Sequence, residues 1–578
     1  MKNNTRKRGR KFLRKFTRAS VKASQEGKEH IKENLLGRFS HIIDIRLLIV
    51  EWSLLVIVLV LLAVTQAFWY ADSYSENTFV EGGTYIEATL GEVDSMNPLF
   101  ATTNSERVLS RLMFATLSEI DYSGHPGIGL AKYISPNEDS TVWTMKLKDG
   151  LKWSDGEPIT NEDVLFTVDL IKNPVVNTVY SSNLSRVKVS ENKEGEIVFE
   201  LPMPYTGFIS ALNFPIVPKH ILSEVDPQTL VEHSFSKTPV TSGPFRFNAL
   251  QTTSIDGEDI IYLSVNPDYY KGKILLNGFA IHDYLSREEI IDAINTGAVT
   301  ATAELSEADT ERITTSQFSF KNASLNSGTF LFFNTSSEKL RNPELRSAIR
   351  QGINLDEIRS IVPNTVALDY PLLSAQISLS NYPEIPKYDL ENAKSKINEL
   401  RPEDYGHINM ATINYGYLPN VAEVLKTKLE NLGFVVDLTK YEENQEFFSN
   451  VISKRGYDIL VYEVELGADP DLLPYYHSSQ ANGSGLNLSN FRNSLADDLL
   501  LGARNATDEK MRALKYESFL EIWASTTPAI GLYQPNLTYY YNKNTRSFSS
   551  DASLVTALDR FVDVNNWAVS KDTKNKTP

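Results

Sequence analysis

Side chains that often carry out catalysis or bind metals are present in this sequence, but their spacing matches no such site. The eight histidines stand at positions 30, 41, 125, 220, 233, 282, 407 and 477. No two of them show HxH or HExxH spacing, and no cysteine is present to supply a thiolate or a disulfide. Walker, G-x-G-x-x-G and G-x-S-x-G motifs do not occur. We therefore expect no metal, no cofactor and no catalytic residues.

Carboxylates are the remaining groups that could act on a substrate. Asp469-Pro470-Asp471 has the spacing of a calcium loop start, but the glycine and the distal glutamate of such a loop are missing. Any two carboxylates could still meet in space as the pair of a glycosidase. A surface hydrolase with a carboxylate pair therefore stays an alternative.

Three loops are rich in aromatic or small polar residues. NYGYLPN (414–420) lies between an expected strand and an expected helix, ELGADPDLLPYY (465–476) follows an expected strand, and NGSGLNLSN (482–490) is a flexible polar loop. Loops that follow the strands of a rigid sheet are where α/β proteins place ligand sites. These loops indicate binding rather than catalysis, although ordinary turns with packed tyrosines would look the same.

The elements that would position these loops can be predicted from local patterns. TYIEATLG (84–91) alternates like a strand, RVLSRLMFATL (107–117) has helical spacing, and VWTMKLKDGLKWSDG (142–156) suggests two strands around a glycine turn. Thr160 precedes two acids and an apolar run, which predicts a helix that begins there and ends at Asn173-Pro174.

The second half predicts a mixed or parallel sheet, because residues 400–470 read as strand, helix, strand, strand. A chain of 578 residues is expected to form two to four domains. No Gly/Ser-rich or Pro-rich linker divides it. We therefore expect domains that interrupt one another, with the chain crossing between them more than once.

The first 70 residues predict a membrane anchor. Residues 1–46 are a basic tail, and residues 47–70 contain the unbroken apolar run LLVIVLVLLAV. The positive charges place the N-terminus in the cytoplasm and the body outside the cell membrane. Cleavage after Thr65-Gln66-Ala67, as in a signal peptide, is the alternative.

The charge is divided unevenly along the chain. Residues 1–50 have a balance of +10, whereas the remainder has −26, which gives the total of −16. An acidic body argues against nucleic acid as a partner, because nucleic-acid binding requires a basic surface.

Six segments occur in the order found in one protein family. They are WTMKLKDGLKWSDGEPITNEDV (143–164), SGPF (242–245), VNPDYYKGK (265–273), FFNTSSEKLRNPELRSAIRQGINLDEI (332–358), YDLENAKSKINEL (388–400) and ADPD (468–471). Through these segments the chain resembles, over about residues 82–565, the extracellular solute-binding proteins of family 5, the peptide and nickel receptors of ATP-driven importers.

The resemblance implies an α/β fold of the type II periplasmic-binding-protein kind, with two lobes that close on a ligand. It places the first lobe at 82–281 with an inserted subdomain at about 110–235, the second lobe at 282–525, and a return to the first lobe at 526–570. Residues 71–81 would form a short linker, and 571–578 a disordered tail.

The resemblance also implies a set of ligand-binding residues. In the family an Asp of the D-P element pairs with the α-amine of the ligand, and here that residue is Asp469. The full set is Asp469, Tyr415, Tyr417, Leu466, Asn104 and Ser105.

The chain departs from the dipeptide receptors at one position. Those receptors carry an Arg in the strand-to-helix loop that binds the ligand's carboxylate, whereas Tyr415 stands at that position here. Leu466-Gly467 also replaces the usual Trp before the D-P element. Without the cation we expect no selection for the free carboxylate of a short peptide, so that longer peptides become favoured ligands.

The function that the resemblance implies is that of a receptor, not an enzyme. It would be a monomer, anchored by one membrane-spanning helix, that captures peptides outside the cell and delivers them to the permease and ATPase subunits of an ABC importer. A peptide chaperone or sensor on the same fold is a second alternative.

Overall fold

The computed structural model describes residues 46–121, 123–178, 180–252, 258–400, 407–442, 447–481, 483, 485–549, 553–569 and 571–575. The chain divides into two compact units, which are Met1–Thr78 with Asp572–Pro578, and Phe79–Lys571. The basic tail at 1–45 and the residues from 576 on lie outside the described residues.

In the first unit, α3 (Arg46–Tyr74) forms over the expected anchor, and its described side chains, residues 50–66, are exposed. Among the residues that the structure describes, no helix is both long and apolar enough to cross a membrane. The anchor at 47–70 therefore stays a prediction.

The predictions of a linker at 71–81 and of a disordered tail at 571–578 are wrong for part of each segment. Strand β1 (Ser75–Phe79) pairs with β21 (Lys571–Asn575) in a two-stranded sheet. The hydrogen bonds of a strand pair come from the main chain, so that a polar sequence such as KDTKN can form one.

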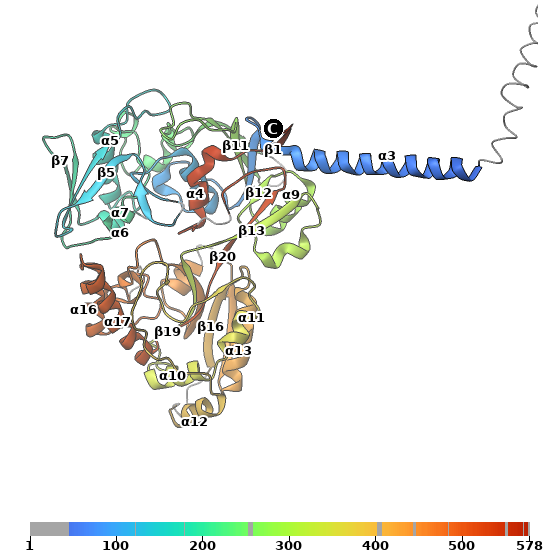
Figure 1. Ribbon diagram of the computed structural model, residues 1–578. Helices are drawn as coiled ribbons and strands as arrows, with labels where there is room; N and C mark the ends of the chain where they lie inside the picture. Colours follow the sequence, from blue (N-terminus) through green and yellow to red (C-terminus); the bar gives the residue numbers. More distant parts are fainter. Residues whose placement is uncertain are drawn as a thin grey trace, which may run out of the picture. The chain divides into compact units, whose positions relative to one another are not determined.

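In the second unit the first lobe is built on a seven-stranded mixed sheet in the order β13-β20-β12-β2-β11-β10-β9 (Figure 1). Its central strand β2 pairs in parallel with β11 and β12, and the other pairs are antiparallel. The bounds are β2 (Thr84–Leu90), β9 (Phe245–Thr252), β10 (Asp259–Val265), β11 (Gly278–Tyr284), β12 (Ala301–Thr302), β13 (Phe318–Ser324) and β20 (Asn536–Asn542). Helices α4 (Asn104–Met113) and α9 (Arg287–Thr296) belong to this lobe.

The second lobe (residues 327–534) is built on a six-stranded sheet in the order β15-β19-β14-β18-β16-β17. Strand β16 pairs in parallel with β17 and β18, which confirms the mixed sheet expected near 400–470. The strands are β14 (Ser327–Phe333), β15 (Val366–Ala367), β16 (His407–Ile413), β17 (Val435–Tyr441), β18 (Ile459–Glu465) and β19 (Ala529–Gln534). The helices are α10 (Pro343–Gln351), α11 (Leu355–Ser360), α12 (Leu390–Leu400), α13 (Leu418–Asn431), α15 (Leu473–Tyr476), α16 (Ser494–Arg504) and α17 (Glu509–Thr526).

The chain crosses from the first sheet to the second between β13 and β14, and returns between β19 and β20. The crossings therefore lie near 325 and 535, rather than at the expected 282 and 526. The difference arises because β12 and β13 follow α9 back into the first sheet, where both pair with β20 from the far end of the chain.

Between α4 and β9 lies the inserted subdomain (residues 118–236), with the four-stranded antiparallel sheet β5-β6-β8-β7. Its strands are β3 (Ser118–Ile120), β4 (Pro126–Ile128), β5 (Ala131–Pro136), β6 (Val142–Leu147), β7 (Lys188–Glu191) and β8 (Ile197–Glu200). Its helices are α5 (Asn161–Lys172), α6 (Ser181–Leu184), α7 (Phe208–Ala211) and α8 (Lys219–Leu222).

Helix α5 begins after Thr160 and ends at Asn173, as expected, with a capping box between Thr160 and Asp163. The second strand expected after Gly150 is instead a single bridge between Lys152 and Pro158. The amide of Trp153 donates to Glu157 O at 2.8 Å, so this donor serves a local turn rather than a strand pair.

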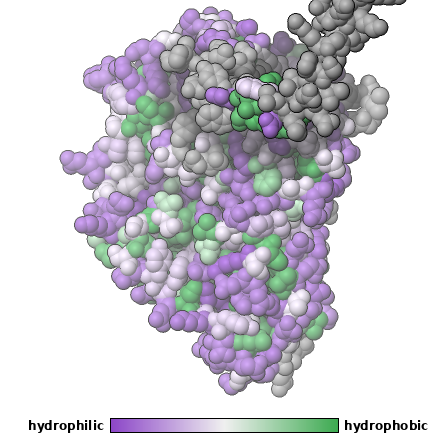
Figure 2. All heavy atoms as spheres, turned by 45° about the vertical axis from the view of Figure 1, so that its right-hand side comes forward, coloured by the Kyte–Doolittle hydropathy of each residue, from purple (hydrophilic) through white to green (hydrophobic). Residues whose placement is uncertain are grey.

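The face of the molecule in Figure 2 is largely hydrophilic, with hydrophobic side chains in small, separate groups. The largest buried side chains include Trp153, Trp523 and Trp567, and each lobe has its own hydrophobic core. A third, smaller hydrophobic cluster includes Ile290, Ile291 and Ile294 of α9.

Candidate functional site

Three adjoining cavities lie in and beside the boundary between the two lobes. The central cavity, of about 200 Å³, is lined by residues of both lobes. It shares Arg107, Thr556 and Leu558 with the first-lobe cavity, which has a volume of about 430 Å³. It shares Tyr415, Glu463 and Asn536 with a tyrosine cavity of about 70 Å³. A ligand bound here would therefore contact both lobes.

Helix α4 presents the first two polar side chains of the central cavity. Its start is fixed by a capping box between Thr103 and Glu106, so Asn104 and Arg107 occupy the first turn. Asn104 Nδ2 donates to Glu304 Oε2 at 3.0 Å. Arg107 Nη2 lies 3.9 Å from Glu465 Oε1 of β18, and both side chains are about half exposed. This contact joins the two lobes weakly, because exposed ion pairs are screened by water.

Glu304 is the buried acid of the cavity wall, with 7% of its surface exposed. Burial raises the pKa of its carboxyl, although the hydrogen bond from Asn104 and the charges of Arg560 and Arg287 oppose the effect. Its neutral form is therefore favoured more than in an exposed glutamate.

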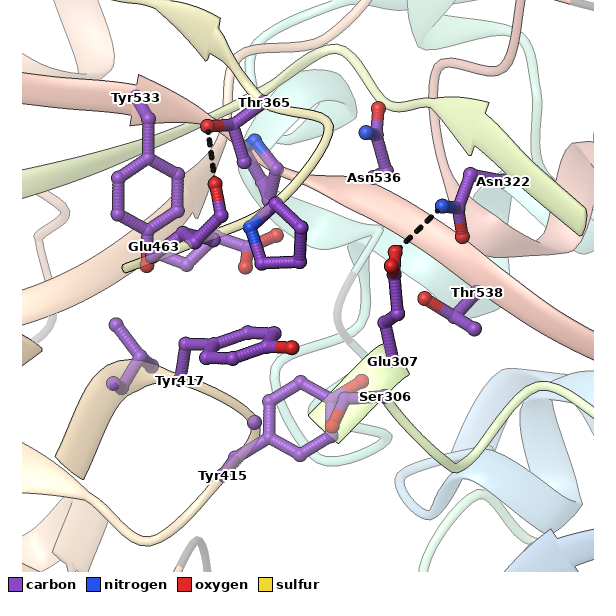
Figure 3. A pocket seen from close by; sticks show the side chains of 15 residues that line it. Ser306, Glu307, Asn322, Thr365, Tyr415, Tyr417, Glu463, Tyr533, Asn536 and Thr538 are labelled. Carbon is purple, nitrogen blue, oxygen red and sulfur yellow. Dashed lines mark hydrogen bonds between the residues drawn. The ribbon is translucent and has the colours of Figure 1, made fainter. Parts of the chain in front are cut away.

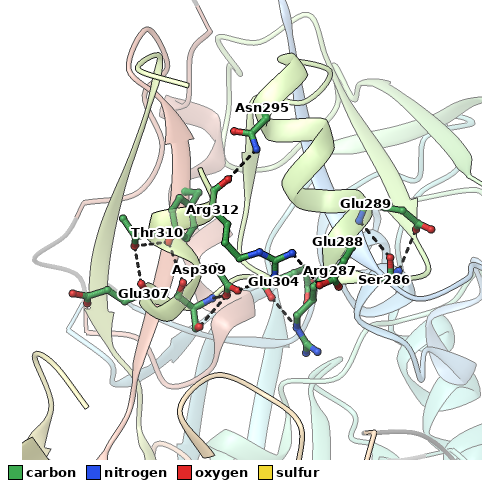
Figure 4. A network of polar contacts seen from close by, with 12 residues as sticks. Ser286, Arg287, Glu288, Glu289, Asn295, Glu304, Glu307, Asp309, Thr310 and Arg312 are labelled. Carbon is green, nitrogen blue, oxygen red and sulfur yellow. Dashed lines mark hydrogen bonds and ion pairs between the residues drawn. The ribbon is translucent and has the colours of Figure 1, made fainter. Parts of the chain in front are cut away.

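Arg287 is the first residue of α9, and a capping box between Ser286 and Glu289 fixes the start of this helix (Figure 4). Its Nε donates to the main-chain oxygen of Glu304 at 3.2 Å. Its guanidinium lies 4.5 Å from the centre of the Tyr415 ring, a cation–π distance. An arginine of the first lobe thus stacks on a tyrosine of the second.

Arg560 forms the third basic side chain of the central cavity, and it is already neutralised. Its Nη2 and Nε donate to Glu87 Oε1 at 2.6 and 3.1 Å, and Tyr539 donates to the other oxygen at 3.0 Å. Both members of the pair are almost fully buried, at 2% and 0% exposure. This pair contributes to the structure of the first lobe rather than to ligand recognition.

The tyrosine cavity is formed around the loop between β16 and α13 (Figure 3). Gly416 has a φ of +54° between Tyr415 and Tyr417, and this left-handed turn presents both rings toward the cavity. Opposite the rings, Asn322 Nδ2 donates to Glu307 Oε2 at 2.9 Å. The cavity is too small for more than a side chain, so it suits a branch of a ligand held in the central cavity.

Asp469 lies outside these cavities, in a second contact between the second lobe and the inserted subdomain. Its carboxylate accepts hydrogen bonds from Arg512 Nη1 at 2.7 Å and Nη2 at 2.5 Å. Gly207 of the inserted subdomain lies so close that a Cβ there would be 2.5 Å from Asp469 Cγ. The carboxylate assigned to a ligand's amine is thus matched by a cation of its own lobe.

The neighbouring Asp471 is likewise paired with an arginine of its own lobe, beside the inserted subdomain. Arg504 Nε lies 3.2 Å from Asp471 Oδ2, and the Arg504 guanidinium lies 4.3 Å from the ring of Tyr205 of the inserted subdomain. Burial raises the pKa of Asp471, against the opposing effect of Arg504. A fourth cavity, of about 560 Å³, lies beside this contact between the same two parts.

The remaining predicted residues are packed into the interior. Leu466 is 4% exposed, and its amide donates to Asn326 O at 2.7 Å. Ser105 is fully buried, with its Oγ 2.7 Å from Thr89 Oγ1. The structure therefore brings Asn104 and Tyr415 together in one cavity and places Tyr417 in the adjoining one. Leu466, Ser105 and Asp469 line none of these three cavities.

Sequence reasoning missed Arg107, Arg287 and Glu304. Arg287 follows a serine and precedes two acids, which predicts a helix start but not a stacking partner far along the chain. Among the described residues, no group of three His, Asp or Glu side chains is placed to hold a metal ion.

Comparisons with known proteins agree with this architecture. The model of the bacterial extracellular solute-binding proteins, family 5 (middle), matches residues 126–485, more than half of the chain. The oligopeptide-binding protein AppA of Bacillus subtilis is 24% identical over 489 residues, which cover 79% of this chain and 87% of AppA.

Three solved structures share the fold over most of this chain. AppA from Bacillus subtilis in complex with a nonapeptide has a TM-score of 0.70 at 21% identity, covering 85% of this chain and 100% of AppA. NikZ from Campylobacter jejuni in complex with Ni(L-His) has 0.72 at 20%, covering 84% and 99%. The substrate-binding protein CtaP from Listeria monocytogenes has 0.73 at 22%, covering 85% and 100%.

Proposed function

The chain belongs to family 5 of the bacterial extracellular solute-binding proteins, and we propose that it is a peptide receptor of an ABC importer that closes its two lobes on the ligand. The observation that carries the proposal is the central cavity, whose walls come from both lobes and offer groups of both charges. AppA, which is similar over most of both chains, is an oligopeptide-binding protein. The receptor has no catalytic role in this proposal.

The cavity chemistry supports a zwitterionic ligand with a peptide backbone. Asn104 offers an amide, Arg107 and Arg287 offer guanidinium groups, and Glu463 and Glu465 offer carboxylates. The adjoining first-lobe cavity, lined by Arg111 and Tyr180 among others, gives room for further residues of a peptide. We infer that Asn104 and Tyr415 contact the ligand and that Tyr417 contacts one of its side chains.

Closure would bring the second lobe against the first lobe at two places, the central cavity and the inserted subdomain. The Arg107–Glu465 contact lies at the central cavity, and the contact of Gly207 with Asp469 lies at the inserted subdomain. We assign Asp469 to this second contact, where it holds Arg512, rather than to the ligand's amine. Rotation of two lobes about a few connecting residues is the usual motion of such folds.

Anchoring in the membrane is the remaining part of the proposal. The exposed side chains of α3 from Leu54 to Val64 are all apolar, which supports insertion in a bilayer over exposure to water. The anchor would keep the body, as a monomer outside the membrane, close to the permease and ATPase subunits of the importer. Extraction of membranes with alkaline carbonate tests it, since the full chain should stay in the pellet and a variant lacking residues 47–70 should not.

Native mass spectrometry of the purified full chain tests the receptor function. We expect co-purified peptides, and a rise in melting temperature when peptides are added to the emptied protein. A protein that carries no peptide, and that no peptide mixture stabilises, would refute the peptide ligand. Hydrolysis of the added peptides or of glycosides would favour an enzyme instead.

A further inference from the structure

Of the three arginines that line the central cavity, Arg287 alone has no carboxylate partner among the described residues. Arg107 has Glu465 at 3.9 Å, and Arg560 has Glu87 at 2.6 Å. Arg287 uses only its Nε, which donates to a main-chain oxygen. A guanidinium has five N–H donors, so four remain for a ligand.

We propose that Arg287 binds a carboxylate of the ligand, and that the receptor therefore selects peptides with a free C-terminal carboxylate. The inference rests on the proposed function, since it concerns the ligand of the same cavity. It replaces the expectation that the chain has no cation for this purpose. The cation comes from the first lobe, not from the loop of the second lobe where Tyr415 stands.

The guanidinium is held in place mainly by its own lobe. The capping box of α9 fixes its main chain and the bond to Glu304 O fixes its Nε, whereas the Tyr415 ring of the other lobe supports one face of its plane when the lobes meet. A planar group fixed in this way can offer its two Nη groups to a carboxylate as a bidentate pair. Little side-chain entropy would be lost on binding.

The neighbouring acid forms no hydrogen bond or ion pair with this cation through its carboxyl. The carboxyl of Glu304 accepts its hydrogen bond from Asn104, and the main-chain oxygen of Glu304 accepts the one from Arg287. Burial raises the pKa of Glu304 more than the nearby charge of Arg287 lowers it, so the charged form of this acid is disfavoured and competes little with a carboxylate ligand.

The stacked pair would couple the carboxylate to closure of the lobes. Arg287 belongs to the first lobe and Tyr415 to the second, and their groups meet at 4.5 Å. A carboxylate bound to Arg287 would thus lie beside the ring of Tyr415. When the lobes close, this ring removes water from the Arg287 guanidinium, and the bound carboxylate would neutralise the positive charge that loses this water. Ligand binding and lobe contact would favour each other.

A binding competition tests the inference. The full chain is incubated with a synthetic pool of random three- to nine-residue peptides, prepared once as free acids and once as C-terminal amides, and retained peptides are quantified by mass spectrometry. We expect the wild type to retain the acids about 10- to 100-fold better than the amides, the worth of hydrogen bonds to a charged group. Arg287→Gln should abolish this preference, and Arg287→Lys should keep part of it.

Arg312→Gln is the matched control, because Arg312 belongs to the same polar network but pairs with Glu288 at 3.0 Å and lies half exposed (Figure 4). It should keep the wild-type preference. Equal retention of acids and amides by the wild type, or an unchanged preference in Arg287→Gln with an unchanged melting temperature, would overturn the inference alone. Retention of neither pool by any variant would refute the peptide ligand and the inference together.

Discussion

Replacing Asp469 separates two roles for the D-P element, support of the fold and recognition of the ligand's amine. Asp469 accepts both Nη groups of Arg512, and the two side chains are only 13% and 10% exposed. Among the described residues the Arg512 Nε has no hydrogen-bond partner, so Asp469 carries most of the compensation for this buried cation. Removing one member of such a pair leaves an unpaired buried charge and costs about 3–5 kcal/mol.

We therefore expect Asp469→Ala to lower the melting temperature strongly. For a lobe of roughly 200 residues, 1 kcal/mol corresponds to about 2–4 °C, so the decrease should be about 6–20 °C. Differential scanning calorimetry of the ligand-free protein measures it. Asp149→Ala is the control, because Asp149 also forms a hydrogen-bonded ion pair, with Lys132 at 3.0 Å, but on the exposed surface.

A double variant tests the cause of the loss. Asp469→Leu combined with Arg512→Met removes both charges and should recover most of the wild-type melting temperature, because apolar groups of similar size often replace a buried pair at little cost. If Asp469→Ala melts like the wild type but no longer binds peptides, Asp469 recognises the ligand and the reasoning fails.

Three further substitutions test other parts of the structure. Burial raises the pKa of Asp283 to about 6, so the folded protein holds the carboxyl proton of Asp283 more tightly than the unfolded chain does. The protonated carboxyl therefore contributes stability below about pH 4, and this contribution is lost as the pH rises through 6. Asp283→Asn should therefore raise the melting temperature at pH 7–8 but not at pH 4, and an equal effect at both would contradict this. Gly207→Ala would place a methyl group 2.5 Å from Asp469 Cγ, so it should weaken peptide binding through incomplete closure and enlarge the radius of gyration in small-angle scattering with peptide bound. A radius identical to that of the wild type would argue against this contact as part of the closed state. Glu304→Gln keeps the bond with Asn104 and removes a disfavoured charge, so calorimetry at pH 7 should show an unchanged or higher melting temperature; a large decrease would mean that the charged form supports the fold.

Local sequence patterns predicted a helix or strand well where the residues that start and end it lie within the segment itself. The helix after Thr160 begins and ends as expected, because its cap and its terminating Asn173-Pro174 lie within the segment itself. The alternating strand and helix patterns likewise predicted the α/β organisation of the second lobe. The boundary at 282 was not, because the placement of β12 and β13 depends on β20, more than 200 residues later.

The same distinction applies to the site. The loop at Tyr415 was predicted from its composition and its place after a strand, and it does line the central cavity. Arg287 was missed because its stacking partner lies in the other lobe. Asp469 was assigned to the ligand's amine from the resemblance, but its partner Arg512 lies 43 residues later in a helix, and no local pattern reveals that pairing.

The return crossing near 535 has a consequence for the synthesis of the protein. One short continuous segment supplies β19, which lies between β15 and β14 of the second sheet, and β20, which lies between β13 and β12 of the first. Neither sheet is complete until this segment leaves the ribosome, after more than nine tenths of the chain has been made. Both lobes would then expose unpaired strand edges during most of translation, which is the condition under which chaperones protect a growing chain. A premature stop before residue 529 would leave both sheets, rather than one, without an inner strand.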